Sequence, residues 1–505
     1  QLRPVNMRVR ASVLAIVGVL FGGCAATPTP AIEEPPPLVV DASIQHRLDV
    51  QVNTKTARNV ILFIGDGMGV ATVTAARIYA GQERGESGEE NALSFEKMPH
   101  LALLKTYTTN SQVSDSAGTA TAMLTGIKTR SGVINVAPNV ARGDCANAHR
   151  NRLESLARQA ETRGMLTGVI STARITHATP AAVYAVSPER NYESDRDIPI
   201  SARNECADIA RQLIGFNAGD GLDVVLGGGY SEFVGTALGG DRVREDDNLV
   251  AKWLAAARGR QFLSTREELA AASTRGQWFG LFSRSHLSFE VQRATDSAQP
   301  SLTDMTMRAL DWFADKEDGY FLVVEAGRID HAHHAARAGV ALAETVEFAR
   351  AIDQTLARVD TADTLVLVTA DHSHTLNIGG YPTRGNPILG LVTTNDARGE
   401  PKAQPELAAD GQPYTTLTYA NGPGAPAAPR ARPRPETGLA AVQQAAIPTG
   451  SRGLDGRFRG SETHGGVDVA LYAVGPWSHL VGGVLEQNAV YHIMRHALGF
   501  DRPTE

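Results

Sequence analysis

The stretch at 113–126, VSDSAGTATAMLTG, places one serine before a run of small residues, directly after a strand-like segment at 101–107. We interpret the small residues as the first turns of a helix packed close to a sheet, with Ser116 at its N-terminus. Backbone N–H groups are unpaired there and the helix dipole is positive, so an anion or a nascent alkoxide is favoured. Taken alone, Ser116 could also be a simple N-cap, which is a preferred role for serine.

Length and composition set wide limits. A chain of 505 residues can form one large α/β domain with insertions, or more than one domain. The net charge of −7 gives no sequence-wide basic field, so no specific nucleic-acid partner is expected. Three cysteines, Cys24, Cys145 and Cys206, are too few for a disulfide framework.

The N-terminal segment is typical of export. Residues 1–23 combine an upstream extension with a signal peptide, in which a basic segment precedes the short apolar run 11–21. Cys24 follows small residues in a loose match to a bacterial lipoprotein cleavage box. We expect Cys24 to be lipidated and the Pro-rich segment within 24–57 to be a tether, with simple cleavage near Ala25 as the alternative. The protein would then lie in the periplasm or on the outer membrane, anchored to the membrane by its N-terminal lipid.

Three apolar segments predict buried strands, and each delivers acidic or imidazole groups at its carboxyl end. The segments and their groups are 59–65 with Asp66, 320–326 with Glu325, Asp330 and His334, and 364–370 with Asp371 and His372. In α/β enzymes this edge of the sheet is where ligands bind. Asp330 and His334 are four residues apart, so one helical turn would place both on one face. The alternative for Asp66 is a plain N-cap in a turn from strand to helix.

Strands and helices alternate along residues 58–505, which we take as one catalytic domain. This order predicts a three-layer α/β fold, with a mostly parallel sheet covered by helices on both faces. Further strands are expected at 166–171, 222–226 and 467–474. Helices are expected at 70–80, 151–163, 203–214, 249–258, 302–313, 336–359 and 484–498. Residues 381–462 are rich in Pro, Gly and Ala and predict an insertion with little regular core.

Histidines gather near these strand ends. Seven of the 14 lie in four short segments, at 177, 331–334, 372–374 and 464. Imidazole together with carboxylate suits Zn²⁺, whereas carboxylate together with hydroxyl suits Mg²⁺. The inventory therefore fits several divalent cations.

Six runs, in this order, resemble those of alkaline phosphatases, closer to the animal and marine bacterial branch than to the enteric one. They are FIGDGMG at 63–69, SDSAGTATAMLTG at 114–126, HATPAA at 177–182, VVEAGRIDHAHH at 323–334, VTADHSH at 368–374 and ETHGGVDVALYAVGP at 462–476. The resemblance extends from residue 59 to the end. It implies an alkaline phosphatase-like fold, a phosphomonoesterase that acts on small phosphate monoesters, and two zinc ions and one magnesium ion as cofactors.

The resemblance also implies a role for each matching residue. Ser116 would be the nucleophile that forms a phosphoserine, and Arg190, 13 residues after His177, would bind the phosphate. One zinc would be held by Asp330, His334 and His464, and the second by Asp66, Asp371, His372 and the Ser116 oxygen. Magnesium would be held by Asp66, Thr179 and Glu325, with His177 beside it. His331 and His374 match positions that lie near the metals without binding them.

Further consequences of the resemblance concern the rest of the chain. Cys145 and Cys206 match a disulfide of the animal enzymes. The additional calcium site of those enzymes is expected to be absent, because its acids fall at Ser283 and Gln299. Residues 381–462 match the crown insertion but diverge between 391 and 450. A homodimer is possible, but we do not expect a dimer contact in this diverged region.

Two other classes of function remain open at this stage. The first is a metal-dependent phosphodiesterase, phosphonate hydrolase or sulfatase of the same superfamily. The second is a non-catalytic phosphate-binding lipoprotein. A binding protein has no need of a nucleophile, and sulfatases use a modified residue in a different motif, so the phosphomonoesterase is the hypothesis that we carry forward.

Overall fold

A computed structural model describes residues 49–293, 298–314, 316–423 and 461–501. Two compact units are distinguished, 1–50 and 51–505, and the fold described below belongs to the second. The predicted signal peptide and Cys24 lie outside the described residues, as do positions 424–460 of the insertion. In the described part of the chain, no helix is both long enough and apolar enough to cross a bilayer.

A ten-stranded sheet organises the second unit, in the order β14-β2-β13-β8-β1-β7-β3-β4-β6-β5. Its strands are β1 (Asn59–Gly65), β2 (His100–Lys105), β3 (Leu166–Arg174), β4 (Val224–Gly228), β5 (Gln261–Leu263), β6 (Trp278–Leu281), β7 (Tyr320–Ala326), β8 (Thr364–Ala370), β13 (Val469–Val474) and β14 (Gly483–Glu486). β13 is antiparallel to both neighbours, and the other pairings are parallel. The mostly parallel sheet is therefore confirmed.

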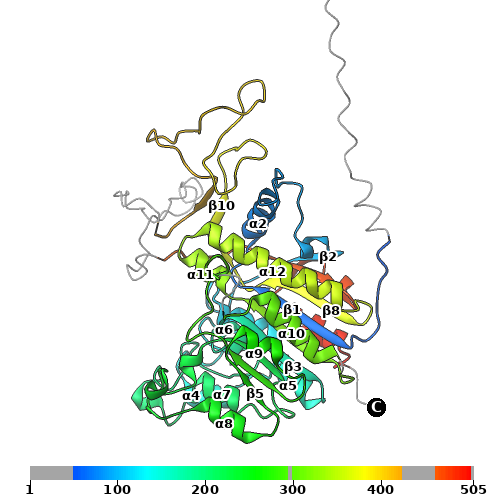
Figure 1. The fold of residues 1–505 in the computed structure, drawn as a ribbon, viewed down its shortest axis with the longest axis vertical. Helices are drawn as coiled ribbons and strands as arrows, with labels where there is room; N and C mark the ends of the chain where they lie inside the picture. The colour runs from blue at the N-terminus through cyan, green and yellow to red at the C-terminus, as the bar shows by residue number, and fades with distance from the viewer. Residues whose placement is uncertain (1–48, 294–297, 315, 424–460, 502–505) are drawn as a thin grey trace, which may run out of the picture. The chain divides into compact units, whose positions relative to one another are not determined.

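Helices cover the sheet in two groups. The α-helices are α2 (Val70–Gln82), α3 (Ser116–Thr125), α4 (Cys145–Arg150), α5 (Leu156–Thr162), α6 (Ala178–Ala181), α7 (Ile209–Ile214), α8 (Leu249–Ala256), α9 (Arg266–Ala271), α10 (Leu302–Ala314), α11 (Arg328–His334), α12 (Ala338–Arg358) and α14 (Ala489–Ala497). α10 and α12 pack on each other in front of the central strands (Figure 1), and α2 and α11 join them. α3 packs against α5, α6 and α14 as a second group. The α/β class with helices around a large sheet is confirmed.

The central strands form the core. β1, β7 and β8 lie side by side, and every residue of β7 and β8 is buried, because both faces of the sheet are covered. Parallel pairing brings their carboxyl ends to one edge, where Gly65 of β1 lies between Ala326 of β7 and Ala370 of β8. The groups that follow these strands therefore start from one place.

Three predicted helices differ from the structure. The helix expected at 151–163 is only α5, which Ser155 caps, because residues 151–153 pair with residues 135–137 instead. The helix expected at 203–214 is only α7, which Asp208 caps, so Cys206 lies before it.

The third difference lies at the C-terminus. Within the helix expected at 484–498, the first residues form β14, which pairs with β2, and α14 starts at Ala489. Local apolar spacing favours a helix, but pairing with β2 makes these residues the edge strand of the sheet.

The insertion has little regular structure in its described part, as expected. β11 (Leu417–Tyr419) pairs with β10 (Leu376–Ile378) just outside it. At its end, β12 (His464–Gly465) pairs antiparallel with β9 (Ser373–His374), placing His464 opposite His374. The chain thus returns from the insertion to the carboxyl end of β8.

Candidate metal centre and nucleophile

The N-terminus of α3 carries the candidate nucleophile. Asp115 is the N-cap, whose side chain accepts a hydrogen bond from the Gly118 N–H at 3.2 Å, and Ser116 is the first helical residue. The interpretation of Ser116 as a cap is therefore wrong. The Ser116 hydroxyl is buried, and its Oγ lies 3.2 Å from His372 Nε2 and 3.5 Å from Asp66 Oδ1.

Carboxylates from two central strands meet at this hydroxyl. His372 Nε2 lies 3.4 Å from Asp66 Oδ1 and 3.3 Å from Asp371 Oδ2, and all three side chains are fully buried. Within the described residues, Oδ2 of Asp66 and Oδ2 of Asp371 have no hydrogen-bond partner. Burial, followed by the charge of Asp371, raises the pKa of Asp66 well above its ordinary value. Buried oxygens without partners are costly unless a cation binds them.

A second set converges on Asp330, which lies on α11. Its Oδ1 is 3.3 Å from His334 Nε2 and 3.4 Å from His464 Nε2. The two Nε2 atoms are 3.1 Å apart. Nδ1 of His334 faces the Glu462 carbonyl oxygen at 2.7 Å, and Nδ1 of His464 faces that of Ser114 at 2.8 Å. Because Nδ1–H donates to a carbonyl, each Nε2 keeps a lone pair that points into the set.

His374 also touches Asp330 but has a different role. Its Nε2 lies 2.8 Å from Asp330 Oδ1, and its Nδ1 lies 2.5 Å from Glu462 Oε2. Burial opposes protonation, yet the hydrogen bonds to Asp330 and Glu462 raise the pKa of His374 to about 9. Both ring nitrogens face carboxylates, so neither lone pair is available to a cation.

A third set of possible metal ligands shares Asp66 with the first set. Ligand atoms of Asp66, His177 and Glu325 lie within 4.8 Å of one another. Among the described residues, Oε1 of Glu325 and Oγ1 of Thr179 are buried without a hydrogen-bond partner. Burial raises the pKa of Glu325 to about 7, although the Ser171 hydroxyl donates to it. Two carboxylates and a hydroxyl are the donor set that Mg²⁺ prefers.

Arg190 lies next to the nucleophile and the third set. Its Nη1 donates to Asp115 Oδ2 at 3.0 Å, and its Nη2 lies 3.3 Å from His177 Nε2. Burial works against the charge, but the Asp115 carboxylate raises the pKa of Arg190. The guanidinium is therefore held charged beside Ser116, the residue that follows Asp115.

The three sets share residues, so they form one centre. Asp66 belongs to two sets, and Asp330 lies within ligand distance of Asp66 and His372 as well as of its own imidazoles. All ten predicted metal-site residues contribute to the centre or border it. The donors fit two imidazole-and-carboxylate cation sites and one carboxylate-and-hydroxyl site.

Sequence reasoning missed two residues of the centre. Asp115, beside Ser116, holds Arg190, and Glu462 binds His374. Glu462 opens the sixth matching run and Asp115 lies within the second, but a carboxylate that bonds a neighbouring side chain has no signature in spacing.

Two other predictions concern the periphery. Cys145 and Cys206 form a disulfide with a Cα–Cα distance of 5.3 Å, as the resemblance implied. Ser283 accepts backbone hydrogen bonds through its carbonyl, and Gln299 Oε1 accepts one from the Ser288 N–H at 2.8 Å. The absence of a calcium site stays a prediction.

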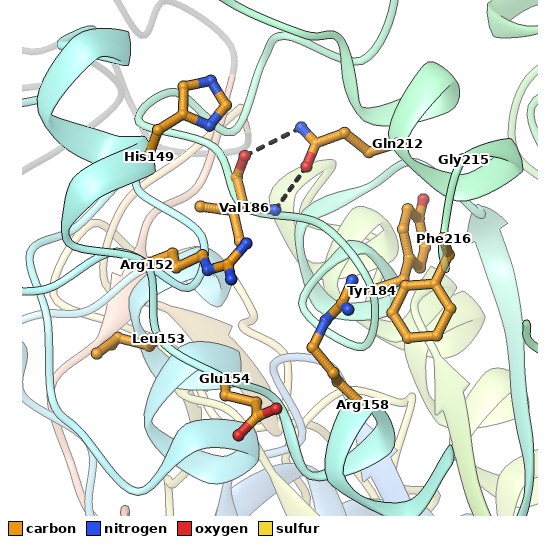
Figure 2. Close-up of a pocket in the computed structure, with 10 residues that line it drawn as sticks. All are labelled: His149, Arg152, Leu153, Glu154, Arg158, Tyr184, Val186, Gln212, Gly215 and Phe216. Carbon is orange, nitrogen blue, oxygen red and sulfur yellow. Dashed lines mark hydrogen bonds between the residues drawn. The ribbon is translucent and has the colours of Figure 1, made fainter. Parts of the chain in front are cut away.

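A separate pocket of about 370 Å³ lies near α4, α5 and α7 (Figure 2). It is lined by His149, Arg152, Leu153, Glu154, Arg158, Tyr184, Val186, Gln212, Gly215 and Phe216. The amide of Gln212 bonds both the N–H and the carbonyl of Val186, and the Arg158 guanidinium lies 4.6 Å from the Phe216 ring centroid. The pocket shares no lining residue with the centre described above.

Comparison with known proteins gives a consistent result. The sequence profile of the family described as alkaline phosphatase matches residues 57–500. Alkaline phosphatase from Gadus morhua is 38% identical over 490 residues, covering 92% of this chain and 98% of the relative. The human tissue-nonspecific isozyme is 38% identical over 477 residues, covering 90% of this chain and 86% of its own.

Solved structures show the same fold. Alkaline phosphatase from Thermus thermophilus superimposes with a TM-score of 0.61 at 23% identity, over 93% of this chain and 96% of the other. The enzyme from the Antarctic bacterium TAB5 gives 0.59 at 21% identity, over 88% and 99%. One variant of the TAB5 enzyme is described with magnesium in a site called M3.

Proposed function

The chain belongs to the alkaline phosphatase family, and from this premise we propose that it hydrolyses phosphate monoesters to an alcohol and inorganic phosphate through a phosphoserine on Ser116. One observation carries the assignment of the nucleophile. The buried Ser116 Oγ lies within 3.5 Å of both His372 and Asp66, at the N-terminus of a helix.

The cofactors would be two zinc ions and one magnesium ion. Asp330, His334 and His464 would hold one zinc, and Asp66, Asp371 and His372 the other. Magnesium would be held by Asp66, Thr179 and Glu325, with His177 beside it. When bound, such cations lower the pKa of a hydroxyl nucleophile and offset the charge of a phosphoryl group.

Arg190, Ser116 and the N-terminus of α3 supply the phosphate binding and the nucleophile. The charged Arg190 fork can bind two oxygens of the phosphate at once. N–H groups at the start of α3 that the Asp115 cap leaves free would donate to the same phosphate. Ser116 Oγ attacks phosphorus, the P–O bond to the leaving alcohol breaks, and water then cleaves the phosphoserine to return the hydroxyl. Four ionised carboxylates and the Ser116 alkoxide would carry five negative charges, and three divalent cations would carry six positive ones. The one surplus positive charge, together with that of Arg190, suits a phosphate dianion.

Two p-nitrophenyl substrates test the proposal. We expect rapid turnover of p-nitrophenyl phosphate and slow turnover of bis-p-nitrophenyl phosphate. Comparable diester turnover would instead make the protein a phosphodiesterase, and phosphate binding without turnover would make it a binding protein. Metal content, measured together with activity before and after chelation, tests the cofactors.

We further propose that the protein is exported and lipidated on Cys24, and that it remains outside the cytoplasm. The support is the basic and apolar segment before Cys24. Mass spectrometry of the mature N-terminus separates a diacylglyceryl-modified Cys24 from an unmodified residue near Ala25. A homodimer is also proposed from the family, and light scattering of the purified protein tests it.

A further inference from the structure

We propose that Glu462 is a positioning residue, whose side chain and backbone together orient the groups around Asp330. The inference rests on the proposed function, since it takes Asp330, His334 and His464 as a zinc site. Glu462 stands two residues before His464, where the chain returns from the insertion, and its side chain is fully buried. A buried carboxylate needs hydrogen-bond partners to offset the loss of water.

The carboxylate is held in one orientation. Its Oε1 accepts the Thr375 N–H at 2.7 Å and also contacts the Thr375 hydroxyl, while Oε2 lies 2.5 Å from His374 Nδ1. On its other side, His374 Nε2 lies 2.8 Å from Asp330 Oδ1. Glu462 therefore fixes the His374 ring, and that ring fixes the oxygen that faces the zinc site.

The backbone of the same residue orients a second group. The Glu462 N–H donates to the His334 carbonyl at 2.9 Å, and the Glu462 carbonyl accepts from His334 Nδ1–H at 2.7 Å. The first bond holds the two backbones together, and the second selects the His334 tautomer in which Nε2 keeps its lone pair. Partners of this kind commonly set the orientation of ligands and the affinity for the metal.

Replacement of the carboxylate alone separates the two contributions. Glu462→Gln keeps the backbone bonds to His334 and nearly the same volume. Its single carbonyl oxygen can accept from Thr375 or from His374 but not from both, because the NH₂ group only donates. We expect about 10- to 100-fold faster zinc release to a chelator. With cobalt(II) in place of zinc, we also expect a changed visible absorption spectrum, which a loss of global stability alone would not produce.

A buried glutamate elsewhere provides the matched control. Glu161 on α5 is 3% exposed and its carboxylate accepts the Thr167 hydroxyl, outside the metal centre. Glu161→Gln should match the unaltered protein in zinc release and in the cobalt spectrum. If it changed both readouts as Glu462→Gln does, the effect would be one of general stability and the inference would be wrong.

The proposed function and this inference fail in different ways. An unaltered protein that retains no zinc overturns the metal assignment before any variant is compared. An unaltered protein that holds zinc, with a Glu462→Gln variant equal to it in both readouts, overturns the positioning role. Should Glu462→Gln not fold, Thr375→Val removes one donor to Oε1 and should accelerate release by a smaller factor; release equal to that of the unaltered protein then overturns the inference.

Discussion

Two clusters of carboxylates in the molecule differ in how their charge is neutralised. The edge cluster lies at the carboxyl ends of the central strands and consists of Asp66, Glu325 and Asp371. The Arg242 cluster lies beside α7 and consists of Arg242, Asp195, Asp208 and Asp247. Among the residues that the structure describes, each acid of the first cluster has one oxygen without a hydrogen-bond partner. The second cluster has a charged side chain at its centre.

The contacts explain the difference. Arg242 is fully buried and donates to Asp247 at 2.8 Å and to both oxygens of Asp208 at 3.0 Å. Burial works against ionisation of Asp247, yet hydrogen bonds from Lys252 and Arg242 lower its pKa to about 2. In the edge cluster, burial raises the pKa of Glu325 to about 7. The Arg242 cluster contains its own cation, whereas the edge cluster presents oxygens that the cations of the proposed function would bind.

Ser116→Ala should give the largest effect, because it removes the attacking group and leaves the edge cluster unchanged. We expect at least about 1,000-fold slower turnover of p-nitrophenyl phosphate. Zinc and magnesium contents, measured by mass spectrometry, should remain those of the unaltered protein. Undiminished turnover would contradict the covalent route.

Arg242→Met should show what the internal cation contributes. Loss of one partner leaves buried carboxylates uncompensated, and we expect about 3–5 kcal/mol less stability towards urea. The folded variant should keep its metals. The control, Arg196→Met, removes an exposed ion pair with Asp241 and should change stability by less than about 0.5 kcal/mol. Equal losses in the two variants would refute the comparison.

In the edge cluster, Asp66→Asn should weaken metal binding without lowering the stability of the metal-free protein. We expect at least about 100-fold weaker zinc binding, because a ligand costs more than its supporting groups. The metal-free variant should be no less stable than the metal-free parent, because one uncompensated buried charge is gone. Asp223→Asn, at another buried acid whose pKa is raised to about 7, should leave zinc binding unchanged. If metal-free Asp66→Asn were less stable than the metal-free parent, the proposed difference between the two clusters would be wrong.

The smallest expected effect is on the dependence of stability on pH between pH 5 and pH 2. The pKa of Asp247 is lowered from 3.8 to about 2, so its contribution is fully present above pH 3.8 and is lost as the pH falls towards 2. The contribution is about 2 kcal/mol. In metal-free protein, Asp247→Asn should therefore lose less stability between pH 5 and pH 2 than its parent. Parallel curves would exclude Asp247 as the source.

Sequence reasoning located most of the centre because its chemistry stands at strand ends. Asp66, Glu325 and Asp371 lie at or just after the ends of apolar strands, and parallel pairing brings those ends to one edge. The spacing of Asp330 and His334 also gave the correct helical face on α11. These features are local, so periodicity and strand order suffice to predict them.

Other features depend on contacts between distant parts of the chain. His464 reaches the centre only through pairing of β12 with β9, across the whole insertion, and its motif alone suggested the role. The sequence predicts helix where β14 lies because the partner that makes it a strand, β2, is far earlier in the chain. The guanidinium at the middle of the Arg242 cluster gave no signal, since no spacing in sequence distinguishes it from a surface arginine.

The place of β13 in the sheet also has a consequence for synthesis of the protein. β2 joins β8 only through β13, and α3 with Ser116 follows β2 in the chain. A nascent chain that has not yet emerged past residue 474 lacks the strand that links β2 to the sheet, and it also lacks α14, which packs on α3. We therefore expect its serine not to be fixed at the centre. Ser116 is translated early but would reach its final position late. Products truncated before residue 474 should therefore lack phosphatase activity instead of retaining part of it.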